Sequence, residues 1–219
     1  KIPSILVMFQ GIFSQAWTMS AVQGYDKDDK NGFFTRMYQS YNLCMVLVCS
    51  VLIMLSRVMA KVLYANDFYN AWKYVPFLLI ASVFGALSGY VGGIYAATKD
   101  TKIFAKTSIM GAVTNLLLTF VLVWKVGVMG AAIASPVSYG LIWYLRIKGI
   151  NKYMNMKINL FKDVFGYIIL FIQTVLLFIF PDNILFFILQ LLAIVILLLL
   201  NKELLSIVII KITNKFIKR

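Results

Sequence analysis

The polar side chains that could do chemistry in this chain are amides, hydroxyls and cations set in long apolar runs. The 219 residues include no histidine and only eight Asp and Glu residues, of which Glu203 is the sole glutamate. Histidine is the commonest general base and the commonest metal ligand. Cys44 and Cys49 show neither zinc-site nor CxxC spacing, so we interpret them as packing residues. The composition predicts a protein that is not an enzyme and needs no cofactor or metal.

Four side chains combine a polar group with enough size to contact a bound ligand. They are Gln15, Trp17, Tyr90 and Tyr95. We predict that these residues line a substrate cavity. Trp17 and Tyr95 have a second interpretation, because aromatic residues also collect at membrane interfaces.

Two cations, Arg57 and Lys73, are candidates for contacting an anionic head group. Arg57 directly follows an apolar run, and Lys61 and Lys73 come soon after it. The alternative is that these long side chains extend to the membrane interface, where their charges stay hydrated.

These residues belong to seven stretches that contain no Asp, Glu, Lys or Arg. The stretches cover residues 2–25, 37–56, 74–98, 107–124, 126–145, 164–181 and 183–201, and each has 18 to 25 residues. A helix rises about 1.5 Å per residue and the hydrocarbon core is about 30 Å thick, so each stretch can cross a bilayer. The chain is also 62% apolar and only 13% charged. We therefore predict an all-α polytopic membrane protein with about seven transmembrane helices.

Lysine and arginine residues are divided unequally between the connections on the two sides of these helices. The C-terminal tail and the connections on the same side contain 16 of these residues, and the other side contains 5. Cytoplasmic connections carry the excess of basic residues. The C-terminus is therefore predicted to be cytoplasmic and Lys1 to lie outside. A chain that starts outside without a signal peptide suggests that an N-terminal part is missing.

The third stretch carries five small residues at a spacing of four, namely Ala81, Gly85, Gly89, Gly93 and Ala97. In lipid, such a face lets another helix approach closely. We predict helix packing along it, and a moving interface in a transporter would use the same face.

Polar residues form stripes along three other stretches. The stripes are Ser4, Gly11, Gln15 and Thr18 in the first stretch, Ser108, Gly111, Asn115 and Thr119 in the fourth, and Ala131, Ala134, Ser135 and Ser138 in the fifth. Polar groups that faced lipid would lack hydrogen-bond partners. The stripes are therefore expected to face either other helices or a watery cavity.

The chain divides into three predicted parts. Residues 1–150 form a five-helix body, and residues 151–201 add an aliphatic two-helix hairpin that faces lipid. In residues 202–219, apolar Leu204, Val208, Ile212 and Phe216 recur every four residues among basic ones. This pattern is typical of a basic amphipathic helix on the cytoplasmic leaflet.

Three segments carry a family resemblance. The first joins Phe13–Trp17 (FSQAW) to Tyr25–Asp29 and the aromatic stretch 33–41, and the second is Thr98–Lys102. The third runs from Asn115 to Gly127 and continues through Gly130 to Ala134. Together they resemble the lipid-linked oligosaccharide flippases for O-antigen and related polysaccharides, in the MOP exporter superfamily.

The resemblance implies a protein of about fourteen helices, with two six-helix lobes around a cavity and two further helices at the end. This chain would then supply the C-terminal lobe and the extra pair, and Asn115 becomes another cavity candidate. The implied function is to flip undecaprenyl-diphosphate-linked oligosaccharide, by alternating access, from the cytoplasmic to the outer leaflet of the bacterial inner membrane. The implied partners are this glycan lipid, membrane lipid and polysaccharide polymerase machinery, without nucleic acid.

A membrane scaffold without transport activity is one alternative, distinguished by whether loss of the protein strands lipid-linked intermediates inside the cell. Two further alternatives remain open. One is a multidrug exporter of the same superfamily, which would favour an apolar or acidic pocket for cationic compounds. The other is a polysaccharide-processing membrane enzyme, which the lack of histidine and of a buried carboxylate pair disfavours.

Overall fold

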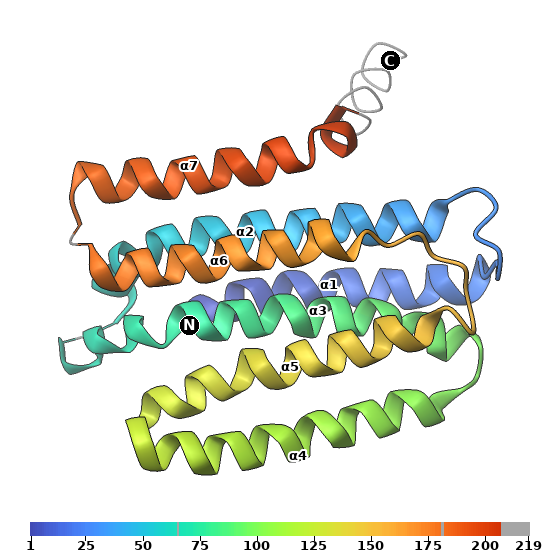
Figure 1. Cartoon of the computed structure of the whole chain (residues 1–219), viewed down its shortest axis with the longest axis horizontal. Coiled ribbons are helices and arrows are strands. Elements are labelled where there is room, and N and C mark those ends of the chain that lie inside the picture. The colour runs from blue at the N-terminus through green and yellow to red at the C-terminus, as the bar shows by residue number, and fades with distance from the viewer. Residues whose placement is uncertain (65, 181, 207–219) are drawn as a thin grey trace.

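Long apolar runs with few helix breakers produce a bundle of helices in the computed structural model, which describes residues 1–64, 66–180 and 182–206 (Figure 1). These residues contain no β-strand. The elements are α1 (Ile2–Gln23), α2 (Phe33–Leu63), the 3₁₀ helix η1 (Asn66–Lys73), α3 (Val75–Ala97), α4 (Thr101–Val126), α5 (Val128–Ile150), α6 (Leu160–Ile179) and α7 (Ile184–Leu200). The predicted all-α fold is confirmed.

Six of the helices, α1 to α6, are long and apolar enough to cross a membrane. Helix α7 is also apolar but has only 17 residues, which corresponds to about 26 Å. The chain is therefore a polytopic membrane protein, with six full-length spans and one shorter apolar helix in its described part.

Four helices, α2, α4, α5 and α6, extend beyond the charge-free stretches that predicted them. Helix α2 continues through Arg57 and Lys61 to Leu63, and α5 continues through Arg146 to Ile150. Arginine and lysine have high helix propensity, so a charge that ends an apolar stretch does not end a helix. This extension brings Arg146 into the bundle.

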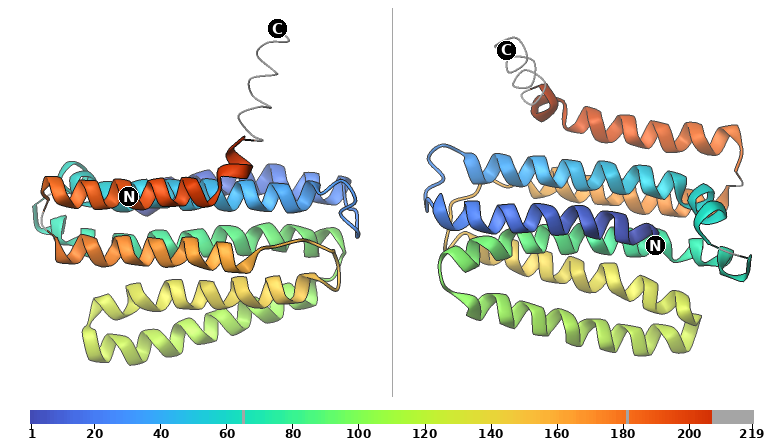
Figure 2. Two further views of the ribbon diagram at one scale, coloured as in Figure 1. Left: turned by 45° about the horizontal axis from the view of Figure 1, so that its top comes forward. Right: turned by 180° about the vertical axis from the view of Figure 1, so that it is seen from behind.

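Helix α3 is at the centre of the bundle and packs against α1, α2 and α5 (Figures 1 and 2). Helix α4 packs mainly against α5 at one edge, and α7 packs against α6 and α2 at the opposite edge. Accordingly, α3 is the most buried of the six long helices and α4 is the most exposed.

Helix α6 shares the hydrophobic core of α1, α2 and α3 through Tyr167, Ile169 and Leu170. Its Gln173 amide bonds to the Ser50 hydroxyl and to the Gln190 amide, both at 2.8 Å. A buried amide in lipid needs such partners. Helix α6 is therefore a core helix as well as one arm of the predicted hairpin, whereas α7 exposes an aliphatic face.

The predicted amphipathic tail falls mainly on residues 207–219, which lie outside the described residues. Within the described part, residues 202–206 form a short helical segment.

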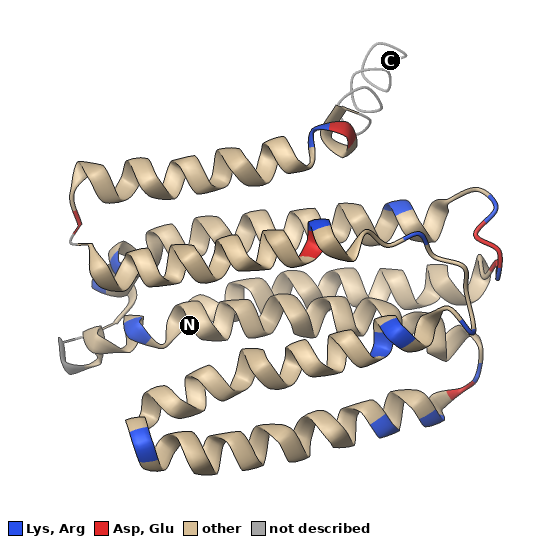
Figure 3. Ribbon diagram, in the orientation of Figure 1, with Lys and Arg blue, Asp and Glu red and all other residues tan. Residues whose placement is uncertain are grey.

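Charged residues gather near the two ends of the bundle (Figure 3). The α1–α2, α3–α4 and α5–α6 connections share one end, and the segment 151–159 ties them together. The Tyr25 hydroxyl donates to the Tyr153 carbonyl at 2.5 Å, and the Asn155 N–H donates to the Lys27 carbonyl at 2.9 Å. The Tyr153 hydroxyl donates to Asp100 at 2.5 Å, and this hydrogen bond lowers the pKa of the Asp100 carboxyl.

Candidate functional site

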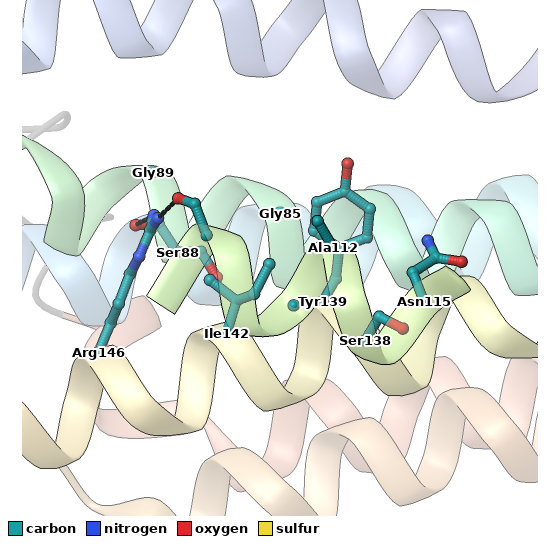
Figure 4. Close-up of a pocket in the computed structure, with 11 residues that line it drawn as sticks. Gly85, Ser88, Gly89, Ala112, Asn115, Ser138, Tyr139, Ile142 and Arg146 are labelled. Atoms are coloured by element: carbon teal, nitrogen blue, oxygen red, sulfur yellow. Dashed lines mark hydrogen bonds between the residues drawn. The ribbon is translucent and has the colours of Figure 1, made fainter. Parts of the chain in front are cut away.

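A cavity of about 390 Å³ lies between α3, α4 and α5 (Figure 4). Its wall consists of Gly85, Ser88 and Gly89 from α3, Ser108, Gly111, Ala112 and Asn115 from α4, and Ser138, Tyr139, Ile142 and Arg146 from α5. Ala112 and Tyr139 are exposed, so the cavity opens to the surface of the bundle. Arg146 and Ser88 lie at one end, and Asn115 and Ser138 lie at the other.

Small residues create the space for this cavity. A side chain on Gly89 would meet no atom within 4 Å, and one on Gly85 would only contact the Tyr139 ring at 3.5 Å. Gly93, one turn further along the same face of α3, instead receives the Trp17 ring of α1. The small-residue face of α3 therefore serves helix packing at Gly93 and leaves open volume at Gly89.

Arg146 is the only charged residue in the cavity wall and is 4% exposed. Its guanidinium donates to the Ser88 carbonyl at 2.9 Å, to the Thr107 hydroxyl at 3.1 Å and to the Ser108 hydroxyl at 2.8 Å. It also lies 4.0 Å from the centre of the Phe104 ring. The described residues place no carboxylate within salt-bridge distance of it. Arg146 is thus a buried cation held by neutral partners.

Burying an unpaired charge costs several kcal/mol, which hydrogen bonds and the aromatic ring offset in part. The Ser88 hydroxyl beside it is also buried, and within the described residues it is the one buried side-chain polar group without a hydrogen-bond partner. A cation and a free hydroxyl therefore share one end of the cavity. An anionic group bound there would compensate both.

The other polar groups in the wall suit a hydroxylated ligand. The Ser108 and Ser138 hydroxyls donate to the carbonyls of Phe104 and Ala134, so their oxygens serve the cavity as acceptors. The Asn115 amide accepts from Thr119 and has its N–H groups left to donate. The wall contains neither a carboxylate nor a cysteine, so it offers hydrogen bonds and one positive charge but no general base. Its volume lies in the usual range for small-ligand sites, roughly 300 to 1,000 Å³. The site is equipped to bind a ligand.

Of the seven cavity residues predicted from the sequence, all of which are described, only Asn115 lies in this wall. Trp17 and Tyr90 are buried in an aromatic core instead. Their rings stack with centroids 4.0 Å apart, and the Trp17 N–H donates to the Tyr90 carbonyl at 2.8 Å. The Tyr90 hydroxyl donates to the Phe34 carbonyl at 2.7 Å.

The remaining predicted residues occupy three different places. Tyr95 is fully buried and its hydroxyl donates to the Arg146 carbonyl at 2.8 Å, so it supports the site from outside the wall. Gln15 is on the exposed face of α1 with the rest of that stripe. Arg57 is in the C-terminal part of α2 and Lys73 ends η1, toward the opposite end of the bundle (Figure 1). Lys73 is exposed, and Arg57 pairs with Asp182 at 2.9 Å.

The predicted stripes on α4 and α5 meet at the cavity through Ser108, Asn115 and Ser138. Sequence reasoning missed Arg146, because it counted this residue among the cytoplasmic cations. The available signal was periodicity, since Ser138, Ile142 and Arg146 follow one another at a spacing of four on one helix face.

Comparison with models of known protein families finds no match for this chain, and neither does a search of curated proteins.

Proposed function

We propose that this chain belongs to a transporter that flips undecaprenyl-diphosphate-linked oligosaccharide across the bacterial inner membrane by alternating access. The product would serve O-antigen or capsule synthesis, alongside polysaccharide polymerase machinery, and the C-terminus would be cytoplasmic. The observation that supports this proposal best is Arg146, a buried cation without an acidic partner in the described residues, in the wall of a hydroxyl-lined cavity.

The chemistry of the cargo matches this wall. A diphosphate and its sugars cannot enter hydrocarbon without losing their hydration. Arginine binds phosphate oxygens strongly because its N–H donors form a planar fork. The Ser88 hydroxyl can donate to the same anion, and Ser108, Asn115 and Ser138 can bond to sugar hydroxyls. The cation role that the sequence suggested for Arg57 and Lys73 is better filled by Arg146.

The lipid tail of the cargo does not need to enter the cavity. The open side of the cavity would let a head group enter while a polyprenyl chain remains in the bilayer. The exposed apolar side chains of α4, including Leu116 and Phe120, are at the same edge of the bundle as the cavity and offer a surface for such a chain.

A multidrug exporter is the competing function. Exporters of cationic drugs would favour an apolar or acidic pocket, and a guanidinium in the wall would repel such compounds. The cavity therefore favours an anionic cargo over a cationic one.

The proposal is tested by replacing the native gene with variants and measuring which leaflet exposes the lipid-linked oligosaccharide. Asn115→Asp adds a negative charge to the wall without changing its size, and Asn115 is only partly buried. We expect this charge to repel the diphosphate, so that the intermediate accumulates in the inner leaflet. Arg146→Ala should have the same effect, and Arg146→Lys, which keeps the charge, should retain part of the activity.

Arg36→Ala is the matched control, because this arginine is exposed and does not belong to the cavity wall. It should leave transport unchanged at equal protein levels. Undiminished flipping by a well-expressed Asn115→Asp variant would overturn the proposal. Resistance to cationic dyes that depends on the wild-type gene would favour the exporter.

A further inference from the structure

A second, smaller cavity lies where α5 ends and α6 begins, outside the site described above. Its volume is about 270 Å³, and its apolar floor consists of Ile147, Met156, Ile158 and Leu160. Lys148 and Asn151 supply polar groups at its edge. We call this feature the α5–α6 groove.

The groove is separate from the Arg146 cavity although the two are neighbours in sequence. Lys148 follows Arg146 by two residues, which places the two side chains about 200° apart around the helix. The two walls share no residue. The groove is therefore a different site from the cavity proposed for transport.

One basic residue, Lys148, belongs to the groove wall, and three further lysines are close to it in sequence. Lys148, Lys152 and Lys157 are exposed, Lys162 is partly buried, and the described residues give none of them a salt bridge. Lys157 lines a different pocket, together with Asp28 and Asp29. Asp163 accepts from Tyr38 and Asn42, and Asp100 accepts from Tyr153. The groove wall itself carries one positive charge, that of Lys148, and no carboxylate.

Exposed apolar side chains continue the floor toward the membrane. Tyr144, which also belongs to the groove wall, and Leu160 are about half exposed, and Phe161 is almost fully exposed. A soluble phosphate would gain nothing from this surface, whereas an acyl chain would bury apolar area against it. Cations beside an apolar groove at a membrane interface match both parts of an anionic phospholipid.

We propose that the α5–α6 groove is a binding site for an anionic phospholipid, with the phosphate beside Lys148 and Asn151 and an acyl chain along Ile158 and Leu160. The positive-inside distribution of charge predicts that this lipid belongs to the cytoplasmic leaflet. The lipid would hold the start of α6 against the end of α5, which otherwise meet through the segment 151–159.

The test is native mass spectrometry of the purified full chain with equimolar phosphatidylglycerol and phosphatidylcholine of identical acyl chains. The wild type is expected to retain phosphatidylglycerol preferentially. Lys148→Ala should reduce that preference about fivefold, the effect of one lysine near an anionic lipid surface. Lys148→Glu should abolish it. Both changes are at an exposed position, so folding is preserved.

Lys106→Ala is the matched control, because this exposed lysine belongs to the same end of the bundle but not to the groove. It should retain the wild-type preference. Equal losses from the two alanine variants would overturn the proposal in favour of a diffuse surface charge. Equal retention of the two lipids by the wild type would also overturn it. Displacement of phosphatidylglycerol by an equal concentration of inorganic phosphate would instead identify a soluble phosphate site.

Discussion

At the scale of single residues, two arginines in the apolar bundle have opposite surroundings. Arg57 has its charge balanced by Asp182 at 2.9 Å and lies 4.5 Å from the centre of the Trp72 ring. It also donates to the carbonyls of Phe180 and Leu177, which are at the C-terminal end of α6. Arg146 has only neutral partners. The ion pair of Arg57 stabilises the fold, whereas the charge of Arg146 would be compensated by the ligand that we propose.

We predict that Arg57→Ala destabilises the protein by about 1.5 to 3 kcal/mol, the range for hydrogen bonds to a charged group. The change removes the donor to the last carbonyls of α6 and leaves Asp182 with only Lys61, at 3.6 Å. Denaturant-induced unfolding in mixed micelles would measure this loss. Lys61→Ala is the control, with an expected cost below about 1 kcal/mol because that lysine is exposed. Equal costs for the two variants would show that Arg57 does not anchor α6.

At the scale of elements, the small-residue face of α3 has two functions along its length. A side chain at Gly93 would come within 2.8 Å of the Trp17 Nε1 atom, whereas one at Gly89 would meet nothing within 4 Å. Trp17 is fixed by its hydrogen bond to the Tyr90 carbonyl and by stacking on that ring. The contact between α1 and α3 therefore depends on Gly93, and the volume of the cavity depends on Gly89.

We predict that Gly93→Ala destabilises the protein by about 1 to 3 kcal/mol, because overpacking must displace the Trp17 ring. Gly89→Ala should be neutral or slightly stabilising, since alanine has the higher helix propensity. Thermal unfolding in detergent compares the two variants directly. Adding Trp17→Phe to the Gly93→Ala variant should recover part of the loss, because the smaller ring frees space. Identical behaviour of the two alanine variants would contradict this division of the α3 face.

At the scale of the whole molecule, the distribution of charge determines the orientation that we expect in the membrane. The α1–α2, α3–α4 and α5–α6 connections share one end of the bundle, so their lysines and arginines act together (Figure 3). The positive-inside rule places this end in the cytoplasm. The α4–α5 turn and η1 are at the opposite end.

Orientation is tested by cysteine labelling in a background where Cys44 and Cys49 are replaced by alanine. We expect Lys125→Cys, at the α4–α5 turn, to react with a membrane-impermeant maleimide in intact spheroplasts. Asn31→Cys, in the α1–α2 connection, should react only after permeabilisation. Both positions are exposed, so a difference in labelling would report the side of the membrane on which each cysteine lies. The reverse labelling pattern would contradict the predicted orientation.

The amino-acid sequence by itself determined the helical class, the membrane location and the approximate position of each long helix. These properties depend on local composition. A run of 18 or more uncharged, mostly apolar residues is long enough to cross the bilayer as one helix, in which the backbone N–H and C=O groups hydrogen-bond to each other. The periodicity of polar residues also identified the α4 and α5 faces that meet at the cavity, including Asn115 and Ser138.

Only the tertiary structure decided which of these faces come together and which remain exposed. In a membrane both the lipid-facing and the buried sides of a helix are apolar, so hydrophobic periodicity does not distinguish them. Trp17 and Tyr90 were therefore predicted to line a cavity, whereas they form an aromatic core between helices. Arg146 was assigned to a cytoplasmic connection because its charge ended an apolar stretch. Its proposed function depends on Ser88, Thr107 and Ser108, which come from two other helices and approach it only when the bundle is packed.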